Sequence, residues 1–223
     1  MIQVSDLRFQ YRSSKFQLRI PELSISRGEK VAIIGPSGSG KTTLLMLLAG
    51  ASPLQHGSIR VDDTQVDRLT EAERRRFRIS RIGIVFQGFE LLEYLTVLEN
   101  ILLPFRINRS LPLSAESKAR AISLAKSTGL SEKLERHPNR LSQGERQRVA
   151  LCRALIARPT VVLADEPTGS LDPQTTQDAL DLLFAQVQQE SATLLFVTHD
   201  HSLLDQFDRT IDLSNFQAPS RGA

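Results

Sequence analysis

Apolar and polar residues follow two different patterns along this chain. They alternate with a period of two from Val4 to Phe9 and from Phe16 to Ile20, which predicts strands. A short continuous apolar run, Val31 to Ile34, ends at Gly35 and predicts a buried strand. Further strands are predicted at Ser58 to Val61, Ile82 to Phe86, Val161 to Ala164 and Thr193 to Val197.

The middle of the chain has a different, mostly helical pattern, which extends from Thr96 to Ala157. Breaks are expected at Pro104, at Pro112 and at Gly129 to Leu130, because proline and glycine interrupt helices. After the strand pattern returns, another helix is predicted from Pro173 to about Gln189.

Strands that alternate with helices predict an α/β fold with a largely parallel sheet covered on both faces. The long helical stretch is expected to form a lobe inserted between two halves of that core. The sequence contains no internal repeat and no low-complexity linker. We therefore predict one domain, 1–223, with a core lobe of 1–87 and 159–213, a helical lobe of 88–158, and a frayed polar tail of 214–223.

Length and composition limit where the chain can act. No apolar run approaches the roughly 20 residues that a membrane-spanning helix needs. The longest candidate, Leu44 to Ala49, is expected to be a short helix after a glycine-rich loop. Met1 to Asp6 lacks the basic and apolar regions of a signal peptide. We therefore expect a cytosolic chain, or one attached to a membrane only through a partner.

Charge and cysteine content narrow the function classes only slightly. The net charge is +3, and the densest basic stretch is Arg74 to Arg78, with Arg81 nearby. That stretch is interpreted as a solvated helix face, with contacts to anionic headgroups or to a partner as alternatives. Few aromatic residues and no nucleic-acid module argue against nucleic-acid binding. The single cysteine, Cys152, excludes an internal disulfide and is expected to be a packed thiol.

A phosphate-binding motif follows the predicted strand that ends at Ile34. Glycines let backbone N–H groups converge on phosphate oxygens, and a following helix adds its positive dipole end. Lys41 would supply charge to the β- and γ-phosphates, and the Thr42 hydroxyl would bind Mg²⁺. Kinases and GTPases share this motif, although the chain has no guanine-specific Asn-Lys-x-Asp. The motif reads Gly35, Pro36, Ser37, Gly38, Ser39, Gly40, Lys41, Thr42.

A second glycine-bearing segment, Leu141 to Glu145, lies about a hundred residues downstream. Ser142 and Glu145 fit a capping box at a helix start. Gly144 is a poor choice for helix stability but suits a backbone that must approach an anion. Because the chain already has one phosphate loop with a lysine, this helix start suits a phosphate held by another subunit.

Two acidic residues end the predicted strand at Val161 to Ala164. Asp165 and Glu166 are therefore expected at the carboxyl edge, where open α/β sheets bind their ligands. Asp165 is suited to holding Mg²⁺, through water, and Glu166 to orienting or deprotonating a water that attacks the γ-phosphate.

The order of these motifs resembles that of the ATP-binding cassette family, over about residues 2 to 213. The resemblance implies an ATPase with a P-loop NTPase (RecA-like) core, an antiparallel β portion and an inserted helical lobe. It also implies a homodimer in which two subunits, head to tail, trap two ATP molecules. The signature differs from the commoner Leu-Ser-Gly-Gly-Gln at Gln143 and Glu145, whereas Ser142 and Gly144 are unchanged, so two competent sites are expected.

The same resemblance suggests roles for single residues. Gln87 resembles the glutamine that binds Mg²⁺ and water, and His199 resembles the switch histidine at the γ-phosphate. Tyr11 matches the aromatic residue that stacks on adenine, although a packed tyrosine, with Phe9 or Phe16 as substitute, is the alternative. The expected nucleotide contacts further include Thr43, Ser142, Gln143, Gly144, Glu145 and Asp172.

Three stretches indicate one branch of the family: Phe86 to Pro104, Leu141 to Val149 and Ala164 to Asp172. They resemble the bacterial lipoprotein-release, macrolide-efflux and cell-division group. This resemblance implies a separate ATPase subunit. It would be a peripheral protein on the cytoplasmic face of the inner (plasma) membrane, bound there only through an integral-membrane permease. Closure of the dimer would drive export or extraction of a lipophilic substrate or lipoprotein, or act as a transmembrane signal without cargo. Soluble translation or repair proteins and importer subunits fit less well.

Overall fold

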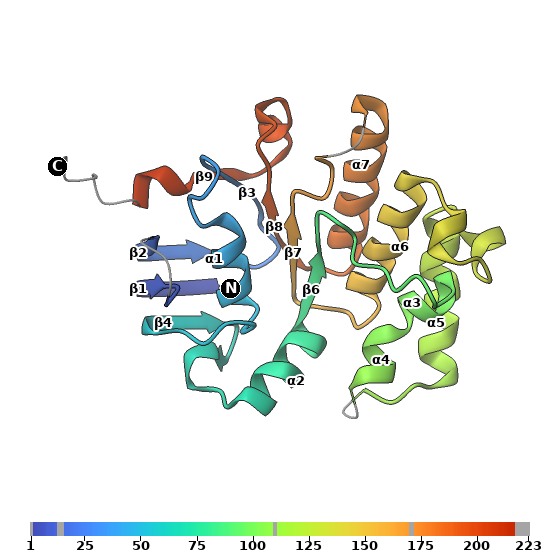
Figure 1. The fold of residues 1–223 in the computed structure, drawn as a ribbon, viewed down its shortest axis with the longest axis horizontal. Helices are drawn as coiled ribbons and strands as arrows, with labels where there is room; N and C mark the ends of the chain where they lie inside the picture. Colours follow the sequence, from blue (N-terminus) through green and yellow to red (C-terminus); the bar gives the residue numbers. More distant parts are fainter. Residues whose placement is uncertain (1, 13–15, 109–110, 170–171, 217–223) are drawn as a thin grey trace.

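The computed structural model describes residues 2–12, 16–108, 111–169 and 172–216. Its strands form two sheets, which lie side by side in Figure 1. The first is antiparallel, with the order β2-β1-β4-β5. Its strands are β1 (Ile2–Gln10), β2 (Gln17–Ile25), β4 (His56–Val61) and β5 (Thr64–Gln65).

The second sheet is parallel, with the order β6-β7-β8-β3-β9. Because all its strands run the same way, their carboxyl ends lie at one edge of the sheet. The prediction of an α/β fold with a mostly parallel sheet and an antiparallel portion is therefore confirmed. The strands are β3 (Lys30–Ile34), β6 (Ile82–Val85), β7 (Val161–Asp165), β8 (Thr193–Val197) and β9 (Arg209–Asp212).

Helices cover both faces of the parallel sheet (Figure 1). No helix in the described ranges is long and apolar enough to cross a membrane. The helices are α1 (Lys41–Leu48), α2 (Glu71–Arg81), α3 (Val97–Ile101), α4 (Leu103–Ile107), α5 (Ala115–Ser127), α6 (Gln143–Leu155) and α7 (Pro173–Gln189). Short 3-10 helices lie at Val66–Arg68, Ser131–Lys133, Pro138–Arg140, His201–Gln206 and Leu213–Phe216.

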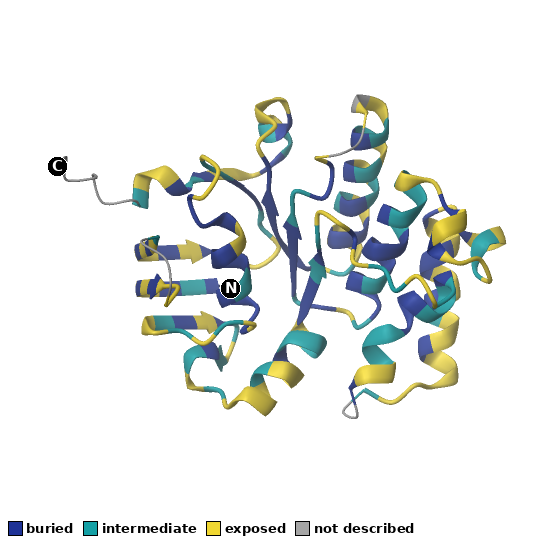
Figure 2. Ribbon diagram, viewed as in Figure 1, coloured by how far each residue is buried: buried dark blue, intermediate teal, exposed yellow. Residues whose placement is uncertain are grey.

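The two faces of the parallel sheet bury different sets of side chains. In β8, Leu195 and Val197 join the core shared with α1 and the antiparallel sheet, whereas Leu194 and Phe196 join the core beneath α6 and α7. This follows from the period of two in a strand. Among the helices of the middle segment, α6 packs on the sheet, and α3 and α5 pack against α6, so their buried side chains belong to the second core (Figure 2).

Several element boundaries differ from the prediction. Pro104 was expected to break a helix, but it lies in the first turn of α4, where a missing N–H costs no hydrogen bond; the interruption falls at Leu102. The helix expected to reach Ala157 ends at Leu155. Strand β9 was not predicted, and Leu213–Phe216 forms a 3-10 helix where fraying was expected. The rest of the expected tail, 217–223, lies outside the described residues.

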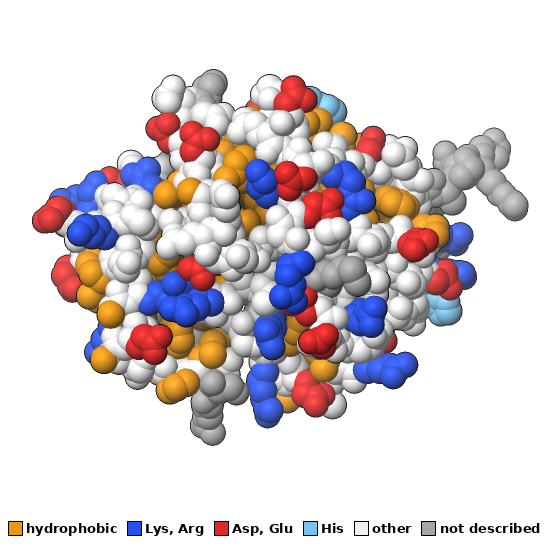
Figure 3. All heavy atoms as spheres, turned by 180° about the vertical axis from the view of Figure 1, so that it is seen from behind, with side chains coloured by type: hydrophobic (Ala, Val, Ile, Leu, Met, Phe, Trp, Pro, Cys, Tyr) orange, Lys and Arg blue, Asp and Glu red, His pale blue; other side chains and the backbone are white. Residues whose placement is uncertain are grey.

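The basic stretch lies on α2, and two of its arginines do more than face solvent. Arg74 donates to the carbonyl of Leu69 at 3.0 Å, and Arg78 donates to the carbonyl of Gly50 at 3.0 Å. Both therefore tie α2 to the chain that precedes it. On the face shown in Figure 3, basic and acidic side chains are interspersed rather than gathered into one basic field.

Cys152 is fully buried on α6, as predicted for a packed thiol. Burial raises the pKa of this thiol to about 11, so it stays protonated at neutral pH. Its sulfur lies 3.3 Å from the hydroxyl oxygen of Thr128. The thiol is therefore part of the core and inert.

Candidate functional site

The phosphate loop connects the carboxyl end of β3 to α1. Lys41, the first residue of α1, is 9% exposed, and its ammonium donates to the carbonyls of Gly35 and Pro36 at 2.8 and 3.2 Å. The helix begins without a side-chain cap from any described residue. Its first N–H groups therefore point into the loop, where an anion can accept their hydrogen bonds.

Gly40, the residue before α1, cannot be replaced without strain. Its φ of 101° lies in the left-handed region, and a Cβ atom there would lie 2.7 Å from Cζ of Phe16 and 3.1 Å from Cδ1 of Leu18. Glycine is thus required both for the backbone angle and for the approach of β2 to the loop.

Two oxygen-bearing side chains meet beside Lys41. The Thr42 hydroxyl donates to Oδ2 of Asp165, at the end of β7, across 2.8 Å. Burial, the largest influence, raises the pKa of Asp165; the Thr42 hydrogen bond opposes this and Glu166 adds to it. A cation held by these two oxygens would favour the charged carboxylate.

Glu166 and His199 form a second pair at the same edge. Nδ1 of His199 lies 3.2 Å from Oε2 of Glu166, and the side chains are 64% and 23% exposed. Glu166 has a positive φ of 45°, and its N–H donates to the carbonyl of Val197 at 3.1 Å. That hydrogen bond fixes the end of β7 against the end of β8 and holds a strained residue at the site.

Gln87 reaches this edge from β6, two residues beyond the strand. A Cβ atom added at Gly169 would lie 3.5 Å from Cε1 of His199 and 3.8 Å from Nε2 of Gln87. Both side chains therefore lie against the same glycine. Four neighbouring strands, β6, β7, β8 and β3, thus bring the predicted phosphate and carboxylate residues together.

A pocket of about 590 Å³ opens in front of these groups, lined by the phosphate loop together with Tyr11, Phe16, Glu166 and His199. Tyr11 is 44% exposed at its mouth, and its hydroxyl lies 3.2 Å from Oγ1 of Thr43. Its ring packs edge-on against Phe9, with centroids 4.9 Å apart. Tyr11 is thus partly exposed beside the phosphate loop and also packed against Phe9, so the stacking and packed interpretations of this residue both stay open.

The signature residues lie away from this pocket. None of Ser142, Gln143, Gly144 and Glu145 lines it, and α6 lies across the parallel sheet from α1 (Figure 1). Ser142 accepts from the N–H of Glu145, and Glu145 accepts from the N–H of Ser142, so the capping box is present.

Two of the predicted nucleotide contacts are engaged elsewhere. Glu145 also pairs with Lys133; burial alone would raise its pKa, but Lys133 and the Ser142 N–H lower it. Asp172 caps α7 by accepting from the N–H and hydroxyl of Thr175, at 3.1 and 2.6 Å. The preceding residues of its motif, 170–171, lie outside the described residues. Neither Glu145 nor Asp172 lines the pocket.

The structure gives a further explanation for the glycine at position 144, which the sequence did not reveal. A Cβ atom at this position would lie 3.2 Å from Cγ2 of Thr175 in the first turn of α7. The small residue therefore allows α6 and α7 to start close together. This explanation adds to the prediction that its backbone approaches an anion.

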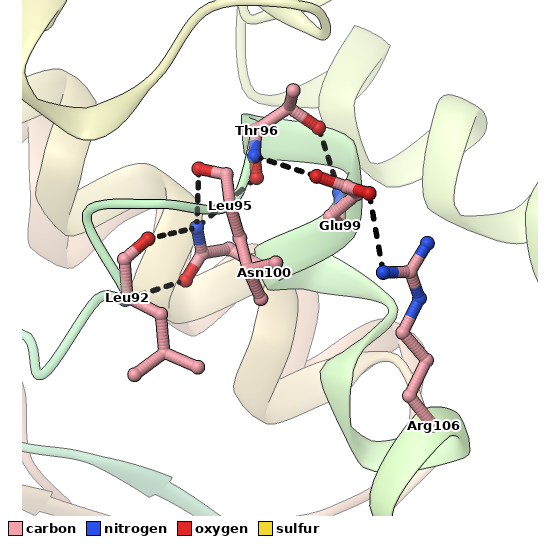
Figure 4. A network of polar contacts seen from close by, with 6 residues as sticks. All are labelled: Leu92, Leu95, Thr96, Glu99, Asn100 and Arg106. Carbon is pink, nitrogen blue, oxygen red and sulfur yellow. Dashed lines mark hydrogen bonds and ion pairs between the residues drawn. The ribbon is translucent and has the colours of Figure 1, made fainter.

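The segment after Gln87 contains contacts that sequence reasoning missed. The carbonyls of Phe89 and Glu90 both accept hydrogen bonds from the guanidinium of Arg153 on α6. Farther on, the fully buried amide of Asn100 bonds to the backbone of Leu92, Leu95 and Thr96 (Figure 4). Arg153 contacts backbone more than 60 residues away in sequence, so no local pattern could have identified it, whereas the partners of Asn100 lie within eight residues of it.

The functional elements found so far occur together in known proteins. Residues 18–169 match the family model described as ABC transporter. The chain is 41% identical to the lipoprotein-releasing system ATP-binding protein LolD of Hydrogenovibrio crunogenus, over 99% of this chain and 97% of that protein. It is 42% identical to the macrolide export ATP-binding/permease protein MacB of Rhodopirellula baltica, over 96% of this chain and 32% of that protein.

A solved structure shows the same fold. It is the dimeric post-hydrolysis state of the ATP-binding cassette MJ0796 bound to ADP and Pi, with a TM-score of 0.84 and 34% identity. The match covers 95% of this chain and 94% of that chain.

Proposed function

This chain belongs to the ABC transporter family as an ATP-hydrolysing subunit, and from that premise we propose that it dimerises on ATP and powers a separate integral-membrane permease. The observation that carries the proposal is the Glu166–His199 pair, 3.2 Å apart at the edge of the pocket that the phosphate loop lines.

The proposed chemistry divides among residues at this edge. The phosphate loop and Lys41 bind the β- and γ-phosphates. Glu166 accepts a proton from, or orients, the water that attacks the γ-phosphate. His199 holds the Glu166 carboxylate in place and contacts the γ-phosphate. Tyr11 stacks on the adenine ring at the mouth of the pocket.

The residues beside Lys41 fit Mg²⁺. The Thr42 hydroxyl and the Asp165 carboxylate lie 2.8 Å apart, and oxygen ligands are those that Mg²⁺ prefers. No cluster of three or more His, Cys, Asp or Glu side chains forms a metal site within the described part of the chain. Here the ion would instead be held by one carboxylate, one hydroxyl, Gln87 and phosphate oxygens. It would neutralise charge on the phosphates.

The homodimer is proposed because the signature lies outside its own pocket. Ser142 and Gly144 at the start of α6 would contact the γ-phosphate of an ATP bound to the other subunit. The dimeric state of the similar cassette supports this arrangement. Two such sites would close together, as expected from the two-fold symmetry of most dimers.

The permease is proposed to bind beside the segment that follows Gln87. A groove of about 270 Å³ lies there between α2 and α4, lined by Phe86, Leu103, Pro104 and Ile107 among others. Ile107 is 63% exposed, which is unusual for a large apolar side chain. The division into a core lobe, 1–87 and 159–213, and a helical lobe, 88–158, would allow the groove to change shape with closure.

The cargo class follows from the relatives. Their names refer to lipoprotein release and macrolide export, which favours export or extraction of a lipophilic substrate over signalling without cargo. The chain would then lie at the cytoplasmic face of the inner (plasma) membrane, held there by the permease alone.

The proposal is tested with Glu166→Gln in the full chain. The variant should retain ATP binding, lose hydrolysis by about 10² or more as expected for a catalytic base, and accumulate as an ATP-bound dimer. Turnover and dimerisation would be measured by phosphate release and size-exclusion chromatography. Wild-type turnover in this variant would refute the proposed role of Glu166 in deprotonating or orienting the attacking water. The same trapped variant, purified from native membranes, should carry a permease.

A further inference from the structure

The loop that follows Gln87 adopts a conformation that most side chains avoid. Phe89 and Glu90 have φ values of 60° and 48°, so two consecutive non-glycine residues lie in the left-handed region. Single residues adopt it occasionally, but a consecutive pair persists only where its surroundings hold it. The loop therefore needs an external constraint.

Arg153 supplies that constraint from α6. Its Nη2 donates to the carbonyl of Phe89 and its Nη1 to the carbonyl of Glu90, each at 2.5 Å. The planar guanidinium presents donors in a fixed fork, so one side chain holds both carbonyls. Burial lowers the pKa of Arg153, but an arginine stays charged at neutral pH.

The same loop is anchored on its other side. The Phe89 ring is 6% exposed and packs in the core that contains Val97 and Leu151. The Phe89 N–H donates to the carbonyl of Phe86 at 3.0 Å, next to Gln87. A shift of Arg153 would therefore move the backbone within two residues of Gln87.

Arg153 and the signature belong to one rigid element. The helix α6 begins just after Ser142 and carries Arg153 three turns later, about 16 Å along its axis. A movement of the signature on contact with a nucleotide would thus be transmitted to the loop without bending the helix.

We propose that Arg153 is a positioning residue that clamps the Phe89–Glu90 turn to the signature helix and so places Gln87 for hydrolysis. The inference rests on the proposed role of Gln87. It predicts that loss of the clamp slows turnover while leaving nucleotide binding at the phosphate loop intact.

The first experiment compares Arg153→Met with Arg120→Met in the full chain. Arg120 on α5 also donates to two carbonyls, those of Leu155 and Ile156 at the carboxyl end of α6, and it pairs with Glu190; these contacts do not involve the loop after Gln87. Arg153→Met should lower kcat about tenfold or more, because a small displacement of a positioned group has a large effect on rate. Its ATP dissociation constant should stay within about twofold of wild type. Arg120→Met should destabilise the fold yet leave kcat within about twofold. Equal effects of the two changes on kcat would overturn the proposal.

Hydrogen exchange supplies a readout that is independent of activity. The amides of Phe89 and Glu90 should exchange faster in Arg153→Met than in Arg120→Met, because local opening is governed by local contacts. Unchanged protection of both amides would contradict the clamp.

A double-mutant cycle that combines Arg153→Met with Gln87→Ala separates this inference from the proposed function. If Arg153 acts through Gln87, adding Arg153→Met to Gln87→Ala should lower kcat by no more than about twofold. Wild-type turnover in Gln87→Ala alone would remove Gln87 from the proposed mechanism. A slow Gln87→Ala with an unaffected Arg153→Met would instead refute only the role of Arg153.

A second-site substitution that restores turnover tests the backbone strain of the Phe89–Glu90 turn directly. It also covers the case in which Arg153→Met folds poorly. Arg153→Lys keeps the charge but holds only one carbonyl well. Glycine adopts the left-handed region without cost, so Glu90→Gly in the Arg153→Lys background should restore kcat to within about threefold of wild type. Absence of recovery would overturn the proposal.

Discussion

Two helix starts in this molecule are predicted to meet phosphate, and they are built differently. At α1 the preceding residue is Gly40, in the left-handed region, and no described side chain caps the helix. At α6 the preceding residue is Ser142, which forms a complete capping box with Glu145. The first start presents backbone donors to an anion, whereas the second already satisfies one of its own.

The difference shows which site is complete within the chain. The α1 start lies beside Lys41 and the Thr42–Asp165 pair, so charge, metal ligands and backbone donors converge there. The α6 start is stable without a ligand and has no lysine in its first turn. It can therefore remain folded and exposed until a second subunit brings a nucleotide to it.

The sharpest test of this comparison is the same substitution at both helix starts. Gly40→Ala places a Cβ at a φ of 101° and 2.7 Å from Phe16, which should destabilise the fold by about 3 kcal/mol and weaken ATP binding more than about tenfold. Gly144→Ala should change stability by less than about 1 kcal/mol, since alanine favours helix and only Thr175 must shift. Urea denaturation and ATP titration would measure both.

Equal losses of ATP affinity in the two variants would mean that the helix starts do not differ as the structure indicates.

Ser142→Arg tests whether the start of α6 contacts a nucleotide held by another subunit. The variant should bind ATP as a monomer with an affinity within about twofold of wild type, because Ser142 lies outside its own pocket. ATP-driven dimerisation should be abolished, since a bulky cation would fill the space of the opposing phosphate. Analytical ultracentrifugation in the Glu166→Gln background would measure this. A dimer that survives the change would refute the opposing-signature arrangement.

The smallest expected effect concerns pH. Glu145 has a pKa below its ordinary value near 4.5, because Lys133 and the Ser142 N–H outweigh burial. A lowered folded-state pKa stabilises the protein above the unfolded value, and that stability is lost as pH falls through the folded value. Wild type should therefore lose more stability than Glu145→Gln as pH falls below about 4.5.

Thermal unfolding between neutral pH and acid would show this as converging curves for wild type and Glu145→Gln. Parallel curves would mean that the ion pair with Lys133 contributes nothing.

The sequence by itself determined the motifs and the edge of the sheet at which they lie. Asp165 ends a buried strand, and Glu166 and His199 lie within two residues of a strand end. Because parallel strands end at one edge of the sheet, local pattern and a general rule place these residues together. The capping box at Ser142 was likewise readable, because its partners are three residues apart.

Only the tertiary structure decided the contacts between residues distant in sequence. These include the approach of Phe16 to Gly40, the packing of Thr175 against Gly144 and the hold of Arg153 on the Phe89–Glu90 turn. It also showed that Asp172 caps α7 and that the middle helices share a core with the sheet. The physical reason is that propensity and periodicity report on neighbours along the chain, whereas these contacts depend on how the elements pack.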